Sequence, residues 1–207
     1  MNLQNNILLE TQFFPTIHYM AAIIKHPSVI IEKNEHFQKG TYRNRCQIAT
    51  AQGCQTLSVP LKKGKNKQQL ISEVQISNDI NWQRPLWRTI QTAYGNAPYW
   101  EHYAPVFEPF FIKKQEYLFD YNLEILQTIL KVMKLDKSIN LSFSNTYEPI
   151  YTEGVDLRNH FSPKNEPTNV NRYPQVFEDR NGFMPHLSIL DLLFCCGKQS
   201  LDILRMT

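Results

Sequence analysis

Hydrophobic residues in the first part of the chain follow strand-like and helix-like periods. Residues 7–9 and 28–32 are short apolar runs that predict two strands. Residues 16–26 have an apolar helical face, and Pro27 ends the predicted helix. A strand, a helix and a strand within about 30 residues match the size of a βαβ unit. We therefore expect the two strands to pair in parallel.

Four further strands are expected from alternation of apolar and polar residues. Residues 46–50 and 56–61 predict a hairpin, because they flank a short turn with glycine. Residues 74–76 predict a short strand, and the apolar positions of 139–143 predict another. The sheet is thus expected to contain both parallel and antiparallel pairs.

The middle of the chain has a helical and aromatic pattern. Residues 117–135 have the widest apolar stripe, which indicates a long amphipathic helix. Residues 87–94 and 96–111 also have apolar residues at helical spacing. A short helix is predicted over 188–194, with Ser188 as its N-cap.

The segment 145–185 is polar, proline-rich and without a regular period. A connection of this length is usually a lid, a binding loop or a segment wrapped over the surface. The whole pattern predicts an α/β fold: a mixed, partly parallel sheet with flanking helices and an irregular C-terminal segment. We expect a core domain over 1–144 with a central helical region, and a loop-rich segment over 145–207 that packs on it.

Composition excludes several classes of protein. The 207 residues are 42% hydrophobic and 20% charged, which is typical of a globular chain and not of a disordered one. No run of about 18 apolar residues predicts a membrane-spanning helix, and the first residues lack the basic region of a secretory signal. Four cysteines, two of them adjacent, predict neither a disulfide scaffold nor a CxxC metal site. We therefore expect a cytoplasmic protein without a metal site.

The spacing of glycines excludes two common phosphate-binding loops. The chain has seven glycines, and the nearest two, Gly53 and Gly64, are still too far apart for a Walker A loop or a GxGxxG motif. The GxSxG and HExxH motifs are also absent. Any bound phosphate is therefore expected to contact side chains or a helix N-terminus.

Positive charge is concentrated in one segment without acidic residues. The chain has a formal charge of +3, and residues 36–72 contain seven lysines and arginines but no Asp or Glu. A local field of one sign attracts an anionic ligand. Nucleic acid is not expected as a partner, because the rest of the chain is acidic. The lysines of 62–67 are also compatible with a solvated hairpin tip.

Arg43 and Arg45 are the strongest candidates for binding an anion. They are one residue apart in a segment predicted to be extended, so their side chains are expected to point the same way. A guanidinium group matches phosphate or carboxylate geometry. The alternative is a structural salt bridge to acids such as Glu32 or Glu35.

Acids and histidines flank the expected parallel strands. Glu32 and Glu35 follow the second strand, and the carboxyl ends of parallel strands face the ligand crevice in open sheets. Either carboxylate is a candidate general base or metal-binding carboxylate, with a solvated strand end as the alternative. His18 and His36 flank the same crevice, although a lone histidine is more often a surface or packing residue.

Three other groups have two interpretations each. Cys46, next to Arg45, is a candidate nucleophile or a buried strand residue. An aromatic cluster is suited either to stacking on a ligand or to core packing: Tyr94, Tyr99, Trp100 and Tyr103. Charged residues in the long polar connection are candidates for a lid over the crevice: Asp156, Arg158 and Lys164.

Short motifs along almost the whole chain carry a family resemblance. They are Gln12-Phe13-Phe14-Pro15, Tyr42-Arg43-Asn44-Arg45-Cys46, Leu57-Ser58-Val59-Pro60, Trp82, Trp87-Arg88-Thr89-Ile90, Ala93-Tyr94, residues 98–103, Asp156-Leu157-Arg158, residues 173–177, Gly182-Phe183 and residues 187–194. In this order they resemble the WbqC-like family of bacterial proteins, and the last block is similar to its Bacteroidetes branch. Relatives commonly have a histidine at the position of Leu86 and an asparagine at that of His186, so no role is carried over to those positions.

The resemblance implies a link to surface-polysaccharide and lipopolysaccharide loci. With the basic segment and the crevice acids, it favours a transferase-type enzyme acting on a phosphate-bearing activated sugar or acyl donor. The candidate catalytic residues are Glu32, Glu35 and His18. The candidate residues for binding the anion or substrate are Tyr42, Arg43, Asn44, Arg45, Arg88, Tyr94, Asp156 and Arg158. The alternative function is a non-catalytic binding or assembly subunit of a glycan-synthesis complex, and the sequence identifies no cofactor.

Overall fold

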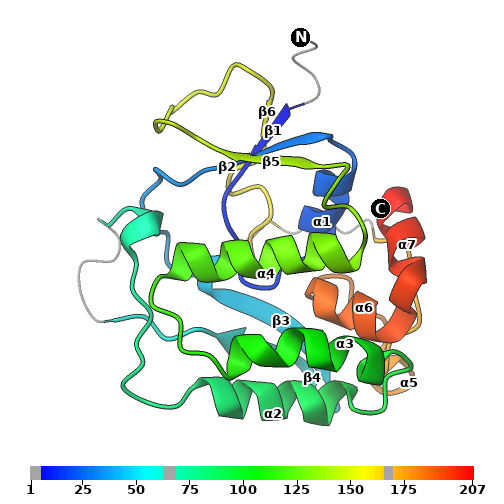
Figure 1. The fold of residues 1–207 in the computed structure, drawn as a ribbon. Helices are drawn as coiled ribbons and strands as arrows, with labels where there is room; N and C mark the ends of the chain where they lie inside the picture. Colours follow the sequence, from blue (N-terminus) through cyan, green and yellow to red (C-terminus); the bar gives the residue numbers. More distant parts are fainter. Residues whose placement is uncertain (1–5, 63–68, 166–169) are drawn as a thin grey trace.

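A four-stranded parallel sheet lies at one end of the molecule (Figure 1). The computed structural model describes residues 6–62, 69–165 and 170–207. The sheet has the order β5-β2-β1-β6, and its strands are β1 (Asn6–Leu9), β2 (Ser28–Ile31), β5 (Asn140–Phe143) and β6 (Val155–Asp156). Every neighbouring pair is parallel, with Val29 opposite both Ile7 and Leu141, and Ile7 opposite Val155. The predicted parallel pairing of residues 7–9 and 28–32 is confirmed.

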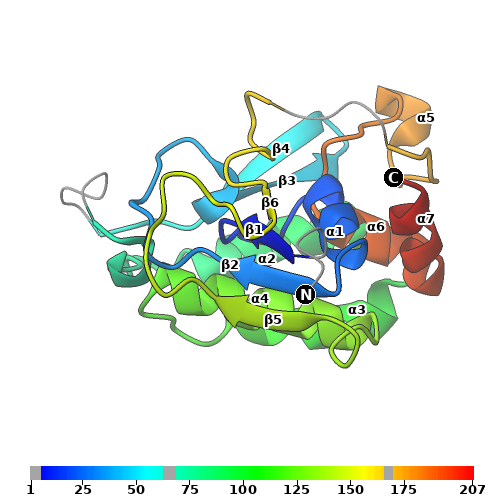
Figure 2. The same cartoon turned by 90° about the horizontal axis from the view of Figure 1, so that it is seen from above.

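Helices cover one face of this sheet, and an irregular segment covers the other. Helices α1 (Ile17–Ile24) and α4 (Leu118–Val132) both lie below the sheet in Figure 1, and Figure 2 shows α4 under β5. The segment 144–154, which we call the arch, passes over the opposite face before it enters β6. A Cβ atom at Gly154 would overlap the backbone of Asn6, so only glycine allows the arch to approach β1 this closely.

A separate antiparallel hairpin and an aromatic helical layer form the other end. The hairpin, β3 (Arg45–Thr50) and β4 (Gly53–Ser58), agrees with the prediction. The helical layer consists of α2 (Gln83–Tyr94), α3 (Trp100–Phe107) and the 3₁₀ helix η5 (Glu108–Phe111). Trp87 stacks between Trp100 and Phe111, with ring centroids 5.3 Å apart in both pairs. The predicted aromatic cluster is therefore largely core packing.

The expected strand over residues 74–76 is wrong. The 3₁₀ helix η4 (Ile71–Glu73) precedes this segment, and single bridges join Ile76 to Leu61 and Gln75 to Tyr117. Isolated bridges satisfy the backbone locally without forming a ladder. The alternating pattern here reflects burial of Val74 and Ile76 and not a strand.

The C-terminal part adds more regular structure than its sequence indicates. It contains α5 (Glu178–Asn181), α6 (Ile189–Cys196), the 3₁₀ helix η6 (Gly197–Gln199) and α7 (Ser200–Met206). Ser188 is the N-cap of α6, as predicted: its hydroxyl accepts a hydrogen bond from the backbone of Leu190 and donates one to the carbonyl of Phe14. Helix α7 was not predicted. No helix in the described residues is long and apolar enough to cross a membrane.

Phe14 connects the two ends of the core. It follows β1 in the left-handed backbone region, with φ 41°, which is unusual for a bulky residue. Its buried ring packs against the rings of Phe107, Phe110 and Phe111. This burial compensates for the unfavourable backbone conformation.

Two glycines with positive φ allow a test of the packing at the C-terminal end. A Cβ atom at Gly197 would overlap the Tyr99 ring, whereas one at Gly182 would meet no atom within 4 Å. Both Gly→Ala changes cost about 1–2 kcal/mol of backbone strain. Urea unfolding measures the loss of stability in each variant. We expect the loss in Gly197→Ala to exceed the loss in Gly182→Ala by about 1 kcal/mol or more, because Tyr99 must move. Equal losses would show that the Tyr99 contact adds nothing.

Candidate functional site

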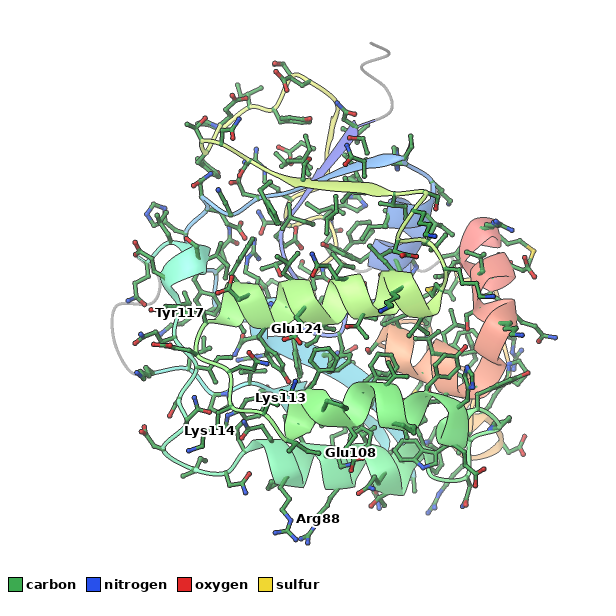
Figure 3. All side chains as sticks on the ribbon, viewed as in Figure 1. Arg88, Glu108, Lys113, Lys114, Tyr117 and Glu124 are labelled. Carbon is green, nitrogen blue, oxygen red and sulfur yellow. The ribbon has the colours of Figure 1, made fainter. Side chains whose placement is uncertain are left out.

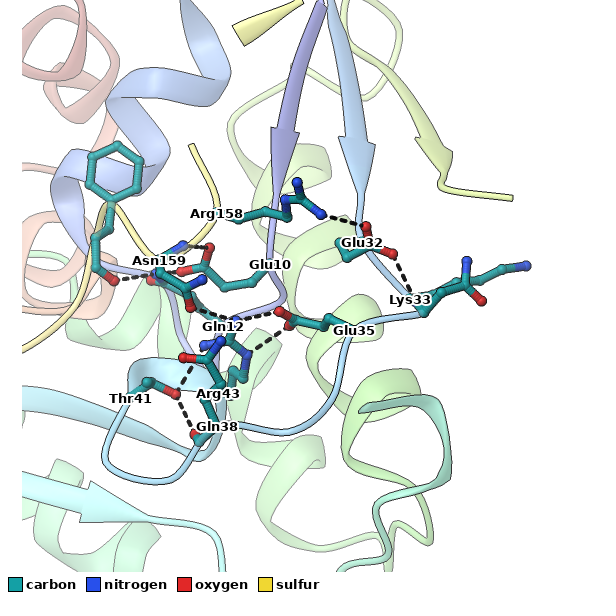
Figure 4. A network of polar contacts seen from close by, with 12 residues as sticks. Glu10, Gln12, Glu32, Lys33, Glu35, Gln38, Thr41, Arg43, Arg158 and Asn159 are labelled. Carbon is teal, nitrogen blue, oxygen red and sulfur yellow. Dashed lines mark hydrogen bonds and ion pairs between the residues drawn. The ribbon is translucent and has the colours of Figure 1, made fainter. Parts of the chain in front are cut away.

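Polar residues gather where the parallel strands end at their carboxyl edge. Glu10 directly follows β1, Glu32 follows β2, Ser144 follows β5, and Arg158 is two residues beyond β6. Figure 4 shows the side chains of Glu10, Glu32 and Arg158 converging from separate segments. Glu10 and Glu32 are each only 1% exposed. In open parallel sheets this edge is where ligands usually bind.

Glu35 and Arg43 form a buried two-point ion pair at this edge. Arg43 Nε lies 2.7 Å from Glu35 Oε1, and Nη2 lies 2.5 Å from Oε2. Thr41 and Asn159 accept further hydrogen bonds from the same guanidinium group. Burial raises the pKa of Glu35 and Arg43 works against that rise; burial alone would lower the pKa of Arg43, but Glu35 raises it. Each group of the pair thus stabilises the charged form of the other.

The expected common orientation of Arg43 and Arg45 is wrong. Residues 42–44 form a 3₁₀ helix, η2 (Tyr42–Asn44), and not an extended segment. As a result, Arg43 is fully buried while Arg45, at the start of β3, is exposed. The alternative of a structural salt bridge to Glu35 is what the structure contains. Because its guanidinium group has no access to solvent, Arg43 does not reach a ligand here.

Glu32 is surrounded by donors from three segments. Its Oε1 accepts from Ser144 Oγ at 2.5 Å and from the backbone of Asn34 at 2.8 Å, and its Oε2 accepts from Arg158 Nη1 at 3.2 Å. A carboxylate has about four acceptor positions. Among the described residues no donor occupies the fourth position, which is on Oε2.

Arg158 fastens the arch to the sheet. Its side chain is 6% exposed and donates to Asp156 Oδ2 at 2.6 Å and to the carbonyl of Glu148 at 2.8 Å. Its guanidinium carbon also lies 5.0 Å from the centroid of the Tyr147 ring, a cation–π contact. Burial works to raise the pKa of Asp156, but the hydrogen bonds from Arg158 lower it overall.

Glu10 holds the chain beyond β6 in place. Its carboxylate accepts from Gln12 Nε2 at 3.1 Å and from the backbone of Asn159 at 2.8 Å. Gln12 also donates to the carbonyl of Phe161. Glu10 was not among the predicted site residues, although it directly follows the strand predicted over residues 7–9. Gln12, Ser144 and Asn159 have no comparable signal, because they are uncharged and only the fold brings them to the edge.

Two cavities open beside this network. The first, of about 220 Å³, is called the strand-edge cavity and is lined by Leu8, Ile30, Glu32, Phe143, Ser144, Asn145, Thr146, Glu148, Tyr151 and Glu153. The second, of about 410 Å³, is called the loop cavity and is lined by Glu35, His36, Phe37, Gln38, Lys39 and Tyr147. The adjacent residues Tyr147 and Glu148 belong to different cavities and separate them.

The two linings differ in charge. The strand-edge cavity has three carboxylates and, among its described lining residues, no lysine, arginine or histidine. The loop cavity has His36 and Lys39, and the carboxylate of Glu35 is already paired with Arg43. The first lining therefore suits a hydroxyl or cationic group and the second suits an anion.

Other predicted site residues lie elsewhere or have structural contacts. His18, on α1, is buried and its ring lies 5.9 Å from that of His186; it lines neither cavity. Arg88 is exposed on α2, and Figure 3 shows it at the end of the molecule opposite the parallel sheet. There it lines a separate cavity of about 440 Å³. Tyr42 is buried, and the Asn44 side chain donates to the carbonyl of Val59.

The Cys46 thiol lies in the interior of the protein. Cys46 is buried on β3, and burial raises its thiol pKa, which disfavours the nucleophilic thiolate. The interpretation as a buried strand residue is therefore confirmed. No group of three or more His, Cys, Asp or Glu residues among the described ones is placed to hold a metal ion. Lys164 is exposed; Lys63, Lys65 and Lys67 lie outside the described residues.

Tyr94 belongs to a second buried polar cluster. Its hydroxyl accepts a hydrogen bond from the backbone of Ala49. Nearby, Tyr173 donates to Asp191 Oδ2 at 2.7 Å and accepts from Gln175. Burial raises the pKa of Asp191 to about 6, although hydrogen bonds from neighbouring side chains oppose the rise. The cluster joins the segment before α5 to helix α6.

Comparison with known proteins finds one family and one distant relative. A sequence model of the WbqC-like protein family matches residues 11–153 and 152–203. The uncharacterized protein Rv1507c of Mycobacterium tuberculosis is 25% identical over 229 aligned residues, which cover 96% of each chain. No solved structure shows a significant match.

The structural role of Arg43 can be separated from that of Arg45. We expect Arg43→Leu to lower the free energy of unfolding by about 3–5 kcal/mol, because it leaves the buried charge of Glu35 without a partner. Arg45→Leu, at an exposed position, is expected to change it by less than about 0.5 kcal/mol. Urea unfolding of both variants measures this difference. Two small and similar losses would contradict the structural assignment of Arg43.

The raised pKa of Asp191 predicts a pH-dependent loss of stability. From its usual value of 3.8 the pKa rises to about 6 on folding, so the folded state binds the proton more tightly. Stability from this group is complete below about pH 4 and is lost as the pH rises through 6. The free energy of unfolding of Asp191→Asn, relative to the unaltered protein, should therefore rise by about 3 kcal/mol between pH 4 and 7. A pH-independent difference would show that Asp191 titrates normally.

Proposed function

The chain belongs to the WbqC-like protein family, and from that premise we propose that it is a cytoplasmic transferase-type enzyme of surface-polysaccharide or lipopolysaccharide synthesis. Its donor is an activated sugar or acyl group that carries a phosphate. The observation that carries the proposal is the pair of adjacent cavities with opposite charge at the carboxyl edge of the parallel sheet. A transferase needs two substrates held side by side, and such a pair provides two places.

The loop cavity is the proposed donor site. His36 and Lys39 are both exposed there: Lys39 supplies positive charge for the donor phosphate, and the His36 ring supplies a hydrogen-bond donor. The Tyr147 ring is 51% exposed and offers an apolar face for the remainder of the donor. Lys39 and His36 thus replace the arginine pair that the basic segment led us to expect.

The strand-edge cavity is the proposed acceptor site, with Glu32 as general base. The free acceptor position on Oε2 takes the proton of the acceptor nucleophile, a hydroxyl or an amine. The nucleophile forms a bond to the donor carbon, and the bond from that carbon to the phosphate oxygen breaks. The phosphate leaves with the electron pair into the field of His36 and Lys39.

Arg158 is the proposed positioning residue for this reaction. It donates a hydrogen bond to Glu32, which lines the strand-edge cavity, and its guanidinium group stacks on Tyr147, which lines the loop cavity. Its hydrogen bond to the Glu148 carbonyl fixes the wall between the cavities. This fixed wall brings the two substrates together in one orientation.

The donor site is tested by calorimetric titration with inorganic pyrophosphate. We expect the double variant His36→Gln/Lys39→Gln to bind at least about tenfold more weakly, equivalent to about 1.4 kcal/mol. Lys137→Gln is the matched control, because Lys137 is exposed just before the amino end of β5, the opposite edge of the sheet. Its affinity should equal that of the unaltered protein.

Two results would contradict the donor site. One is pyrophosphate binding that the double variant leaves unchanged, which would place the anion elsewhere. The other is no binding to the unaltered protein, which would favour the alternative function of a non-catalytic binding or assembly subunit.

A further inference from the structure

The strand-edge cavity has a polar lining with more acceptors than donors. Glu32 lies at its inner end with 1% exposure, and Glu148 and Glu153 lie on the arch. Ion pairs within the described residues include Glu32, through Arg158, but neither Glu148 nor Glu153. Carboxylates near one another repel unless a cation or a donor-rich group lies between them. The lining therefore favours a ligand that carries positive charge.

A hydroxyl group inside the same cavity is also available to a ligand. The Tyr151 oxygen is buried and forms no hydrogen bond of normal geometry with a described residue. Burial raises the pKa of Tyr151, and the nearby Asn6 side chain acts in the opposite direction. The Tyr151 hydroxyl lies beside the Asn6 side chain and has capacity for a second hydrogen bond, which a ligand in the cavity can form.

The remaining lining describes the rest of the ligand. Leu8 and Ile30, a cross-strand pair, form an apolar floor, while Ser144, Asn145 and Thr146 add short polar side chains. The volume of about 220 Å³ far exceeds the roughly 10–15 Å³ that one water needs. A small molecule with an apolar ring face and several hydroxyl groups matches this surface.

We propose that the strand-edge cavity binds a hydroxyl-bearing primary amine in its protonated form, held between the carboxylates of Glu32, Glu148 and Glu153. The inference rests on the proposed function in one respect: it makes this amine the acceptor of the transferase, which becomes nucleophilic when its ammonium group gives a proton to Glu32. The same acidic lining repels phosphate, so each substrate is directed to its own cavity.

The proposal is tested with D-glucosamine and D-glucose, two probes that differ in one amino group. Calorimetric titration at pH 7 should show at least tenfold tighter binding of glucosamine. The double variant Glu148→Gln/Glu153→Gln keeps the shape of the lining and removes two exposed charges, so folding is expected to be unaffected. It should reduce the preference for glucosamine at least fivefold. Glu101→Gln, an exposed change on α3, is the matched control and should preserve it.

Equal binding of the two probes, no binding of either, or an unchanged preference in the double variant would each overturn the proposal. Titration of the same double variant with pyrophosphate tests the donor site separately from the amine site. Retained pyrophosphate binding without an amine preference would leave the donor site standing and remove the amine. An amine preference without pyrophosphate binding would establish the amine site and remove the donor site.

Discussion

The buried ion pair between Arg43 and Glu35 determines how the parallel sheet meets the rest of the molecule. Arg43 precedes the hairpin, whereas Glu35 follows β2, so their contact joins the two sheets. The same guanidinium group donates to Asn159, and the Arg43 carbonyl accepts from Asn122 of α4. One arginine thus connects four segments. A buried charge is unfavourable without its partners, so none of the four can move independently of the others.

Arg158 also joins separate segments of the chain through its hydrogen bonds. It is bound by Glu32, Asp156 and the arch carbonyl of Glu148, and it positions the wall between the cavities. Both arginines therefore have structural partners, which leaves the proposed ligand contacts to Glu32 and to the exposed residues that line the cavities. This division follows from the two-point geometry of guanidinium, which fixes carboxylates better than a lysine does.

Periodic parts of the fold could be predicted from the sequence, and short aperiodic parts could not. The parallel pair, the hairpin and the cap at Ser188 have clear patterns, because burial repeats at a fixed spacing. Residues 42–44 have none, so the 3₁₀ turn that buries Arg43 was missed, and with it the separation from Arg45. The two-residue strand β6 is too short to show a period. Candidate residues at strand ends, such as Glu32 and Glu35, could be predicted because topology places them, whereas Asn159 and Ser144 depend on long-range contacts.

The shared wall makes the two cavities thermodynamically dependent on each other. Tyr147 lines one cavity and Glu148 the other, and Arg158 contacts both residues as well as Glu32. A ligand that shifts the Tyr147 ring also changes the environment of Arg158 and hence the donors to Glu32. By linkage, a ligand in either cavity then alters the affinity of the other by the same factor. Because one arch contributes to the linings of both cavities, binding in one cavity is expected to be coupled to binding in the other.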